Sequence, residues 1–249
     1  MRRAASGLLV TEPPDPGGDL PVTNGLVLDL DASKLDLNDN DAVATWPDQS
    51  GLGNDAEQTS GSSQPTYKAN VLNSLPVVDF GNNSDYLVVP HHGSLNVTNI
   101  TVFLVVMVES GGLSNYEAFV HKGPNEAYQL FAADDRAYRP WMRLDISGNA
   151  DLGRGASSLL ARNEFTVQSW RYDGDYGEFR VDGQGEWLDG SASGDIDPSS
   201  SDLGIFYRST STSSTIGGQL AQLVIYDRAL TTVERDDVES HLASKWGLT

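Results

Sequence analysis

The chain contains no cysteine among its 249 residues. Disulfide frameworks, thiolate-ligated zinc or iron–sulfur centres and cysteine nucleophiles are therefore excluded. Basic residues are scarce as well, with 4 lysines and 12 arginines against 25 aspartates and 10 glutamates, which gives a formal net charge of −19. Because nucleic acids and anionic membrane surfaces are bound through basic side chains, this balance argues against both as partners.

Long apolar runs are also missing. No apolar stretch approaches the roughly 18 residues that a membrane-spanning helix needs, so we expect no membrane insertion. Near the N-terminus, residues 4–10 form a short apolar run, but Ser6 and Gly7 interrupt it and the sequence Glu12-Pro13-Pro14 follows. A secretory signal peptide has a longer uninterrupted apolar core and a small-residue cleavage site, so we expect no export signal here.

The excess of short carboxylates has two interpretations. One is an ordinary acidic surface on a water-soluble protein. The other is adaptation to molar salt, where a Debye length near 3 Å screens the repulsion between carboxylates. The low lysine content and the excess of Asp over Glu favour the second interpretation.

From residue 25 onward, short apolar runs alternate with turn-forming residues. About a dozen such runs occur between residues 26 and 226, separated by Gly, Asn, Asp, Ser and Pro. Many short strands without intervening helices predict an all-β, two-sheet antiparallel sandwich. Residues 100–108 are apolar almost throughout and predict a central strand covered on both faces. The pair Asp182-Gly183 predicts a hairpin turn.

The two ends of the chain differ from this pattern. Residues 1–24 hold four prolines and little periodicity, which predicts an extended N-terminal arm. Near the C-terminus, Thr231 and Glu234 have the spacing of a capping box. Apolar side chains then recur at every fourth position, as Val238, Leu242 and Trp246. We therefore expect a helix over residues 231–246, within a single domain that covers residues 25–249.

Short motifs also occur in a characteristic order. The first are Leu28-Asp29-Leu30-Asp31-Ala32-Ser33, Trp46-Pro47-Asp48-Gln49-Ser50-Gly51 and Gly53-Asn54-Asp55-Ala56. Later ones are Gln64-Pro65-Thr66-Tyr67, Leu75-Pro76-Val77-Val78-Asp79-Phe80-Gly81, Asp85-Tyr86-Leu87, Ser169-Trp170, Tyr172-Asp173-Gly174, Phe179-Arg180-Val181-Asp182-Gly183, Ile225-Tyr226-Asp227-Arg228-Ala229-Leu230-Thr231 and Lys245-Trp246-Gly247-Leu248. In this order they resemble the laminin-G-like family of concanavalin A-like jelly rolls, in the variety common in bacterial and viral surface proteins.

The resemblance covers about residues 25–249 and implies a jelly-roll fold with non-catalytic carbohydrate or protein recognition outside the cell. One fold of this kind hosts many functions, so it carries less information about function. Many relatives have an acidic pair on the last long strand that helps to hold a structural calcium ion. Here residues 219–223 contain Gln219 and Gln222 instead, so a calcium site of that type is not expected.

Catalytic groups are poorly arranged for glycan cleavage. A hydrolase needs two carboxylates that flank the scissile bond, and enzymes of this architecture usually carry them as Glu-x-Asp-x-x-Glu, a string that this sequence lacks. A polysaccharide lyase would need a His or Tyr base with an arginine. The residue types occur at His91, His92, His121, Tyr138, Arg139 and Arg143, but the histidines are too scattered for a catalytic set. We expect no enzyme, with a hydrolase or lyase as the alternative.

Two acidic loops are candidates for a structural Ca²⁺. Residues 36–41 alternate oxygen-bearing side chains like the start of an EF-hand loop, but they lack its glycine and its final acid. The loop over residues 48–55 offers further oxygens. The candidate ligands are Asp36, Asn38, Asn40, Asp48 and Asp55. An acidic loop that binds no specific ion remains the alternative.

Sugar-binding sites commonly combine an aromatic ring with Asn, Asp or Arg side chains. One stretch of the chain contains this combination, in Tyr128, Asp134, Asp135, Arg136, Tyr138, Arg139 and Trp141. We predict these residues as the ligand-binding patch, with aromatic packing at a sheet edge as the alternative. Trp46, Trp170 and Trp246 are assigned to the core.

Together these features predict a module for recognition or display. We hypothesise a spike, fibre or decoration protein on the virion surface of a halophile virus, which binds a host cell-surface glycan or glycoprotein. Its N-terminal arm would contact further copies of the chain, as a homo-oligomer, or other virion subunits. A stand-alone exported, extracellular carbohydrate-binding or adhesion protein is the alternative.

Overall fold

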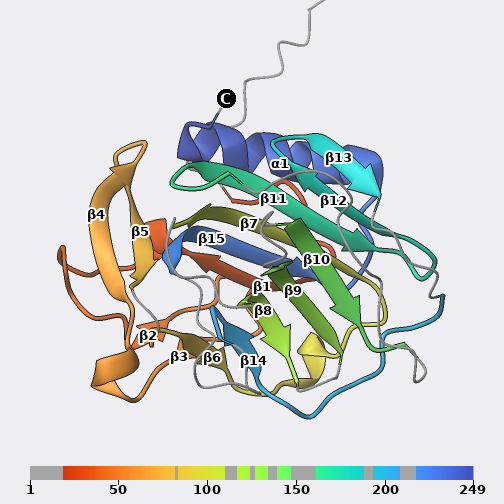
Figure 1. Ribbon diagram of the computed structural model, residues 1–249, viewed down its shortest axis with the longest axis horizontal. Helices are drawn as coiled ribbons and strands as arrows, with labels where there is room; N and C mark the ends of the chain where they lie inside the picture. The colour runs from red at the N-terminus through yellow and green to blue at the C-terminus, as the bar shows by residue number, and fades with distance from the viewer. Residues whose placement is uncertain are drawn as a thin grey trace, which may run out of the picture.

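The computed structural model describes residues 19–81, 84–109, 117–123, 127–133, 139–146, 161–187, 193–207 and 217–248. These residues form two antiparallel sheets and one α-helix (Figure 1). The strands are β1 (Leu26–Asp31), β2 (Thr45–Trp46), β3 (Ala56–Glu57), β4 (Thr66–Leu72), β5 (Leu75–Phe80), β6 (Leu87–Val89), β7 (Ile100–Val108), β8 (Glu117–Lys122), β9 (Tyr128–Ala133), β10 (Arg139–Leu144), β11 (Phe165–Tyr172), β12 (Gly177–Val181), β13 (Gln184–Trp187), β14 (Leu203–Ile205) and β15 (Gly218–Tyr226). The helix is α1 (Thr232–Trp246), and 3-10 turns occur at Ala32–Lys34, Gly61–Ser63 and Gly93–Leu95.

The sheets are stacked as a sandwich. The eight-stranded sheet has the order β13-β12-β11-β7-β15-β5-β4, with β1 paired to β15, and the seven-stranded sheet has the order β10-β9-β8-β14-β6-β3-β2. This arrangement confirms the predicted all-β, jelly-roll-like sandwich with a C-terminal helix. No helix in the described part of the chain combines the length and apolar character that crossing a membrane requires.

Strand β7 lies at the centre of the eight-stranded sheet, between β11 and β15. Eight of its nine residues are buried, as its nearly continuous apolar sequence predicts. The core between the sheets includes a ring cluster in which Phe206 stacks on Phe80, with centroids 4.3 Å apart, and meets Phe119 edge-on at 5.9 Å. Trp46, Trp170 and Trp246 are all fully buried, which confirms their assignment to the core.

Helix α1 covers the outer face of the eight-stranded sheet (Figure 1). The Thr231 side chain accepts a hydrogen bond from the Glu234 backbone N–H, while the Glu234 carboxylate accepts from the Thr231 N–H, so the predicted capping box is present. Gly247 ends the helix in the left-handed conformation, with φ of 69°. The predicted apolar stripe of Val238, Leu242 and Trp246 is buried.

The folded domain begins earlier than the sequence predicted. Leu20 is buried in the core, and the Val22 carbonyl accepts a hydrogen bond of 2.8 Å from the Tyr226 hydroxyl. Because these contacts tie this segment to β15, the predicted boundary at residue 25 is corrected, and residues 19–24 belong to the folded domain. Residues 1–18 of the predicted arm lie outside the described residues.

Candidate functional site

A row of residues on the outer face of the seven-stranded sheet gathers polar groups. Strand pairing places Arg143, Gln129, His121, Gly204 and Val88 side by side on β10, β9, β8, β14 and β6. Side chains alternate between the two faces of a strand. The adjacent residues are all buried in the core, namely Met142, Leu130, Val120, Ile205 and Leu87. The row therefore faces away from the core.

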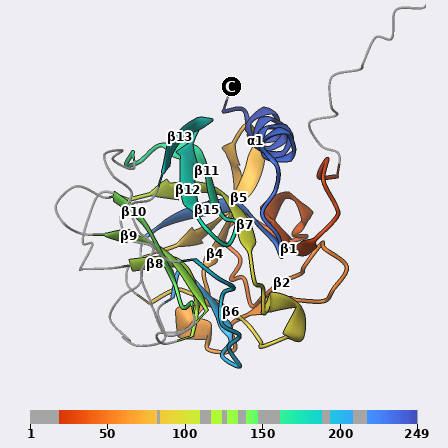
Figure 2. The same cartoon turned by 90° about the vertical axis from the view of Figure 1, so that its right-hand side faces the viewer.

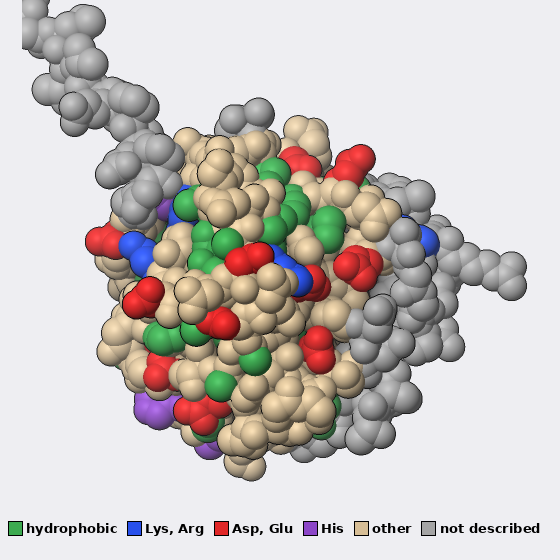
Figure 3. All heavy atoms as spheres, turned by 90° about the vertical axis from the view of Figure 1, so that its left-hand side faces the viewer, with side chains coloured by type: hydrophobic (Ala, Val, Ile, Leu, Met, Phe, Trp, Pro, Cys, Tyr) green, Lys and Arg blue, Asp and Glu red, His purple; other side chains and the backbone are tan. Residues whose placement is uncertain are grey.

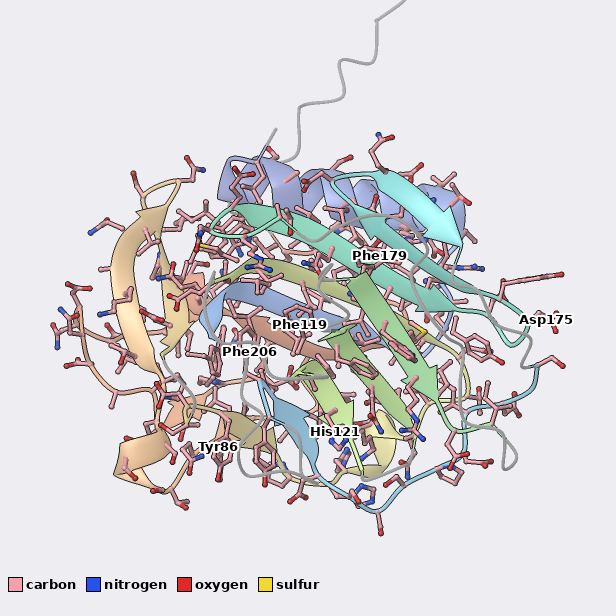
Figure 4. The ribbon with its side chains drawn as sticks, in the orientation of Figure 1. Tyr86, Phe119, His121, Asp175, Phe179 and Phe206 are labelled. Atoms are coloured by element: carbon pink, nitrogen blue, oxygen red, sulfur yellow. The ribbon has the colours of Figure 1, made fainter. Side chains whose placement is uncertain are left out.

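Three residues of this row, His121, Gly204 and Val88, line a pocket of about 460 Å³, which we call the outer-face pocket. Its lining residues are Tyr86, Val88, His121, Ser200, Ser201, Asp202, Gly204 and Tyr207. Figure 4 shows Tyr86 and His121 in the same part of the molecule, close to β14. The volume lies within the usual range of small-molecule sites, about 300–1,000 Å³.

Two tyrosines form one wall of the outer-face pocket. The rings of Tyr86 and Tyr207 are stacked, with centroids 4.3 Å apart and an interplanar angle of 18°. Gly204 makes room for this wall, because a Cβ at its position would lie 2.9 Å from the Tyr207 carbonyl oxygen and 3.0 Å from its ring carbon Cδ1. Burial raises the pKa of Tyr207, so its hydroxyl stays neutral at physiological pH.

The segment over residues 200–202 also lines the outer-face pocket. Asp202 is exposed, and its Oδ1 accepts a hydrogen bond of 2.7 Å from the His91 backbone N–H. Below it, the fully buried Lys122 donates through Nζ to the Ser201 carbonyl oxygen at 2.7 Å. Burial lowers the pKa of Lys122, and the nearby Asp202 carboxylate acts in the opposite direction. Lys122 therefore holds the segment over residues 200–202 in place through this hydrogen bond, while its own side chain is shielded from solvent.

The predicted ligand-binding patch is only partly on this face. The Tyr128 ring is completely buried in the core and its hydroxyl donates to the Leu95 carbonyl at 3.3 Å, so its predicted contact with a ligand needs correction. Trp141 does lie on the outer face, where it stacks on Phe131 with centroids 5.5 Å apart. Arg139 is the first residue of β10, where the structure describes only its backbone. Asp134, Asp135, Arg136 and Tyr138 lie outside the described residues.

The first predicted calcium loop covers the edge of β4. The Asn40 backbone N–H donates to the Tyr67 carbonyl at 2.9 Å, and Asp39 Oδ1 accepts from the Ala69 N–H at 2.9 Å. Asn40 Oδ1 accepts from Lys68 Nζ at 2.7 Å. Uncovered edge strands invite association with other chains, so these contacts give the loop a structural role. Asp36 and Asn38 lie at its exposed start.

The second predicted calcium loop is organised around Asp48. Its Oδ1 accepts from the backbone N–H groups of Asp29 and Ser50, both at 2.9 Å, and its Oδ2 accepts from Ser50 Oγ at 2.6 Å and Asn54 N at 3.0 Å. Asp55 Oδ1 in turn accepts from the Asp48 N–H at 2.8 Å. A calcium ion at Asp48 would have to displace these donors. Among the described residues, no three His, Asp or Glu side chains are grouped to hold a metal ion. Calcium binding stays a prediction.

The chain is similar in structure to domains of several solved proteins. The binding domain of Paraclostridial Mosquitocidal Protein 1 aligns with a TM-score of 0.63 and 16% identity, over 90% of this chain and 55% of that chain. Trypanosoma rangeli sialidase in complex with sialic acid aligns with a TM-score of 0.56 and 19% identity, over 91% of this chain and 34% of that chain. The third structure is domain 4 of AbnA, a GH43 extracellular arabinanase from Geobacillus stearothermophilus, in complex with arabinotriose. It aligns with a TM-score of 0.59 and 13% identity, over 89% of this chain and 98% of that chain.

No protein-family model matches the sequence, and no curated protein sequence matches it. This chain spans about half of the mosquitocidal binding-domain structure and about a third of the sialidase. At identities below 20%, these similarities show a shared β-sandwich fold.

Proposed function

We propose that the protein is a non-catalytic glycan-binding module of the laminin-G-like type, and that the outer-face pocket receives the sugar. The observation that carries the proposal is the stacked pair Tyr86–Tyr207, which lines the same hollow of suitable size as Asp202. A tyrosine ring offers an apolar surface to the C–H face of a sugar, and a carboxylate accepts strong hydrogen bonds from its hydroxyls.

The charge of the pocket favours a neutral sugar. Asp202 is the only charged group among the described lining residues that is open to solvent, because Lys122 lies buried beneath residues 200–202. A sialic or uronic acid in this pocket would bring its own carboxylate close to that of Asp202, at a range where even concentrated salt screens the repulsion least. We therefore propose a neutral hexose or pentose unit of a cell-surface glycan or glycoprotein as the ligand.

The similar structures support a carbohydrate ligand without assigning one. Domain 4 of the arabinanase was solved with arabinotriose, and it aligns over nearly its whole length. The sialidase and arabinanase names also raise the alternative of catalysis. A glycosidase of the usual kind needs two carboxyl groups about 5–9.5 Å apart. Asp202 is the one carboxylate among the described residues of the outer-face pocket, which favours binding without cleavage.

For the setting of the module, we propose an extracellular surface in concentrated salt, such as the virion surface of a halophile virus. The acidic composition supports this, and in Figure 3 acidic side chains are spread over the visible face with few basic ones between them. A role as a spike, fibre or decoration subunit requires that the chain sediments with virus particles. Proteomics of purified particles tests this setting, and an exported adhesion protein is the alternative.

A glycan array tests the ligand proposal. We expect wild-type protein to bind neutral glycans, and Tyr207→Ala to weaken binding at least about tenfold, equivalent to about 1.4 kcal/mol. Tyr176→Ala removes an exposed tyrosine in another loop and serves as the matched control, with wild-type binding expected. The array is run at salt concentrations from about 0.15 to about 3 M, which spans weak to strong screening. Equal binding by the two variants would contradict the proposal, and so would the absence of wild-type binding at every salt concentration.

A further inference from the structure

A second pocket lies on the other layer of the sandwich, beside the C-terminal half of α1. It has a volume of about 280 Å³, and we call it the helix-side pocket. Its walls come from residues 19–26, from β1, from the loop at Gln49 and Ser50, and from α1. Figure 2 shows the segment that leads into β1 next to the helix, which is seen nearly end-on. The outer-face pocket is formed by the other sheet, so the two sites are independent.

The base of the helix-side pocket is a network of buried polar groups. Gln222 is 2% exposed, and its Oε1 accepts from Trp246 Nε1 at 3.0 Å and from Lys245 Nζ at 3.2 Å. Lys245 also donates to the Asp31 carboxylate. These contacts commit the buried ammonium group to Asp31, and they fix the orientation of the Gln222 amide.

The orientation of that amide presents its N–H₂ group to Asp29. Gln222 Nε2 donates to Asp29 Oδ1 at 2.8 Å. Asp29 lines the pocket and is 8% exposed, yet its second carboxylate oxygen accepts no hydrogen bond from any residue that the structure describes. Buried carboxylates ordinarily have a cation or several donors as partners. One acceptor at the base of the pocket is therefore open to a donor from outside.

We propose that the helix-side pocket binds a primary ammonium group, which donates a hydrogen bond to the second oxygen of Asp29. The lining carries three carboxylates, Asp19, Asp29 and Asp31, and two ammonium groups, Lys34 and Lys245, of which Lys245 is paired with Asp31. This excess of one negative charge matches a monovalent cation. A divalent metal is disfavoured because the described residues provide no group of three acidic or histidine ligands. The volume, slightly below the usual range for drug-sized ligands, suits a short amine or a lysine side chain.

The test follows two signals in uniformly ¹⁵N-labelled full-length protein, the Trp246 indole N–H and the Gln222 side-chain amide. Both groups belong to the network that holds Asp29. We expect n-butylammonium chloride to shift them saturably, and tetramethylammonium chloride and KCl to leave them in place at equal chloride concentration. Identical shifts with all three salts would report ionic strength alone and overturn the proposal.

Matched variants locate the site. Asp29→Asn should weaken butylammonium binding at least tenfold, whereas Asp237→Asn, on the exposed face of α1, should bind like wild type. Thr23→Trp narrows the mouth of the pocket without touching the network, so it should also weaken binding if Asp29→Asn fails to fold. Wild-type affinity in both Asp29→Asn and Thr23→Trp overturns the proposal. The ammonium group could come from a free short amine or from a lysine side chain of a partner protein. A titration with N-acetyl-lysine methylamide in place of butylammonium distinguishes them, because tighter binding of the lysine analogue assigns the site to a partner protein.

Discussion

At the scale of single residues, Asp29 combines burial with incomplete pairing. Its carboxylate accepts one hydrogen bond from Gln222, while Asp31 and Asp48 add negative charge nearby. Burial raises the pKa of Asp29 to about 6, with Gln222 and Lys245 acting in the opposite direction. The unfolded chain has a pKa near 3.8 for this group, so the folded protein binds the proton more tightly than the unfolded chain does.

This difference predicts the pH dependence of an Asp29→Asn variant. A carboxyl group whose pKa is raised on folding lowers stability above that pKa, and the loss is relieved as the pH falls from 6 toward 4. At pH 7 we expect Asp29→Asn to be more stable than wild type by up to about 3 kcal/mol, and the advantage to shrink at pH 4.5. Urea unfolding at both values measures the difference. Asp237→Asn should change stability by less than about 0.5 kcal/mol, and an Asp29→Asn effect that is the same at both pH values would contradict the raised pKa.

Single residues also mark the limit of prediction from sequence. Tyr128, Gln129 and Leu130 alternate in a way that is compatible with either face of β9, and only the pairing with β8 and β10 turns Tyr128 inward. The role of Gly204 is equally invisible in the sequence, because its missing Cβ matters only once Tyr207 folds back over β14. The predicted patch shares a sheet face with the outer-face pocket through Trp141, but none of its residues is among the described residues that line the pocket.

At the scale of elements, α1 has two layers of polar contacts. Arg228 binds Glu234 through two hydrogen bonds of 2.6 and 2.9 Å, with both side chains partly exposed. Arg235 is completely buried between the helix and the sheet, where Nη1 lies 2.7 Å from a Glu178 carboxylate oxygen and Nε donates to Ser169 Oγ at 2.8 Å. The same pairing of arginine with glutamate thus occurs once near solvent and once in the interior.

We expect the two arginines to contribute differently to the free energy of unfolding. Arg235→Met leaves the partly buried Glu178 and the buried Glu239 with Arg180 as their remaining cation, so we expect a loss of free energy of unfolding of about 3–5 kcal/mol. Arg228→Met removes a pair that water can replace, and it should cost less than about 1 kcal/mol. Thermal and urea unfolding of the two variants provide the comparison. Similar losses in both would show that burial does not set the strength of these contacts.

The sequence predicts the helix but not its buried charges. The capping box and the apolar stripe are local patterns, so the spacing of Thr231, Glu234 and Val238 was sufficient to place α1. Arg235 lies between those positions, and its partners Ser169 and Glu178 come from strands more than 50 residues away (66 for Ser169). Contacts of that range depend on strand register, which a local pattern does not specify.

At the scale of the whole molecule, the layered fold follows from the apolar pattern and the functional sites do not. In the described parts of the chain, fifteen strands separated by turn residues bury one core between two sheets, whatever the exposed residues are. The outer faces are less constrained by this core, and structures that share the sandwich fold align with this chain at under 20% identity. Gln222 gives one example of a role set by its surroundings, since its neutral amide bridges Asp29 and Lys245.

The net charge of −19 predicts how the molecule responds to salt. Repulsion among the surface carboxylates opposes the compact state, and added ions screen it. We expect the melting temperature to rise between 0.1 and 3 M KCl by at least about 4 °C, the shift that about 1–2 kcal/mol produces in a chain of this length. A variant with Asp175, Asp195 and Asp237 changed to Asn removes three exposed charges and should show a smaller rise.

The shape of the salt response separates screening from general salt effects. Screening is almost complete near 1 M, where the Debye length is about 3 Å, so most of the rise should occur below that concentration. Exclusion of salt from the protein surface would instead raise the melting temperature steadily up to 3 M, equally in wild type and in the three-Asn variant. A melting temperature that stays constant over the whole range would remove the physical basis for a protein adapted to concentrated salt, and with it the main support for a halophile setting.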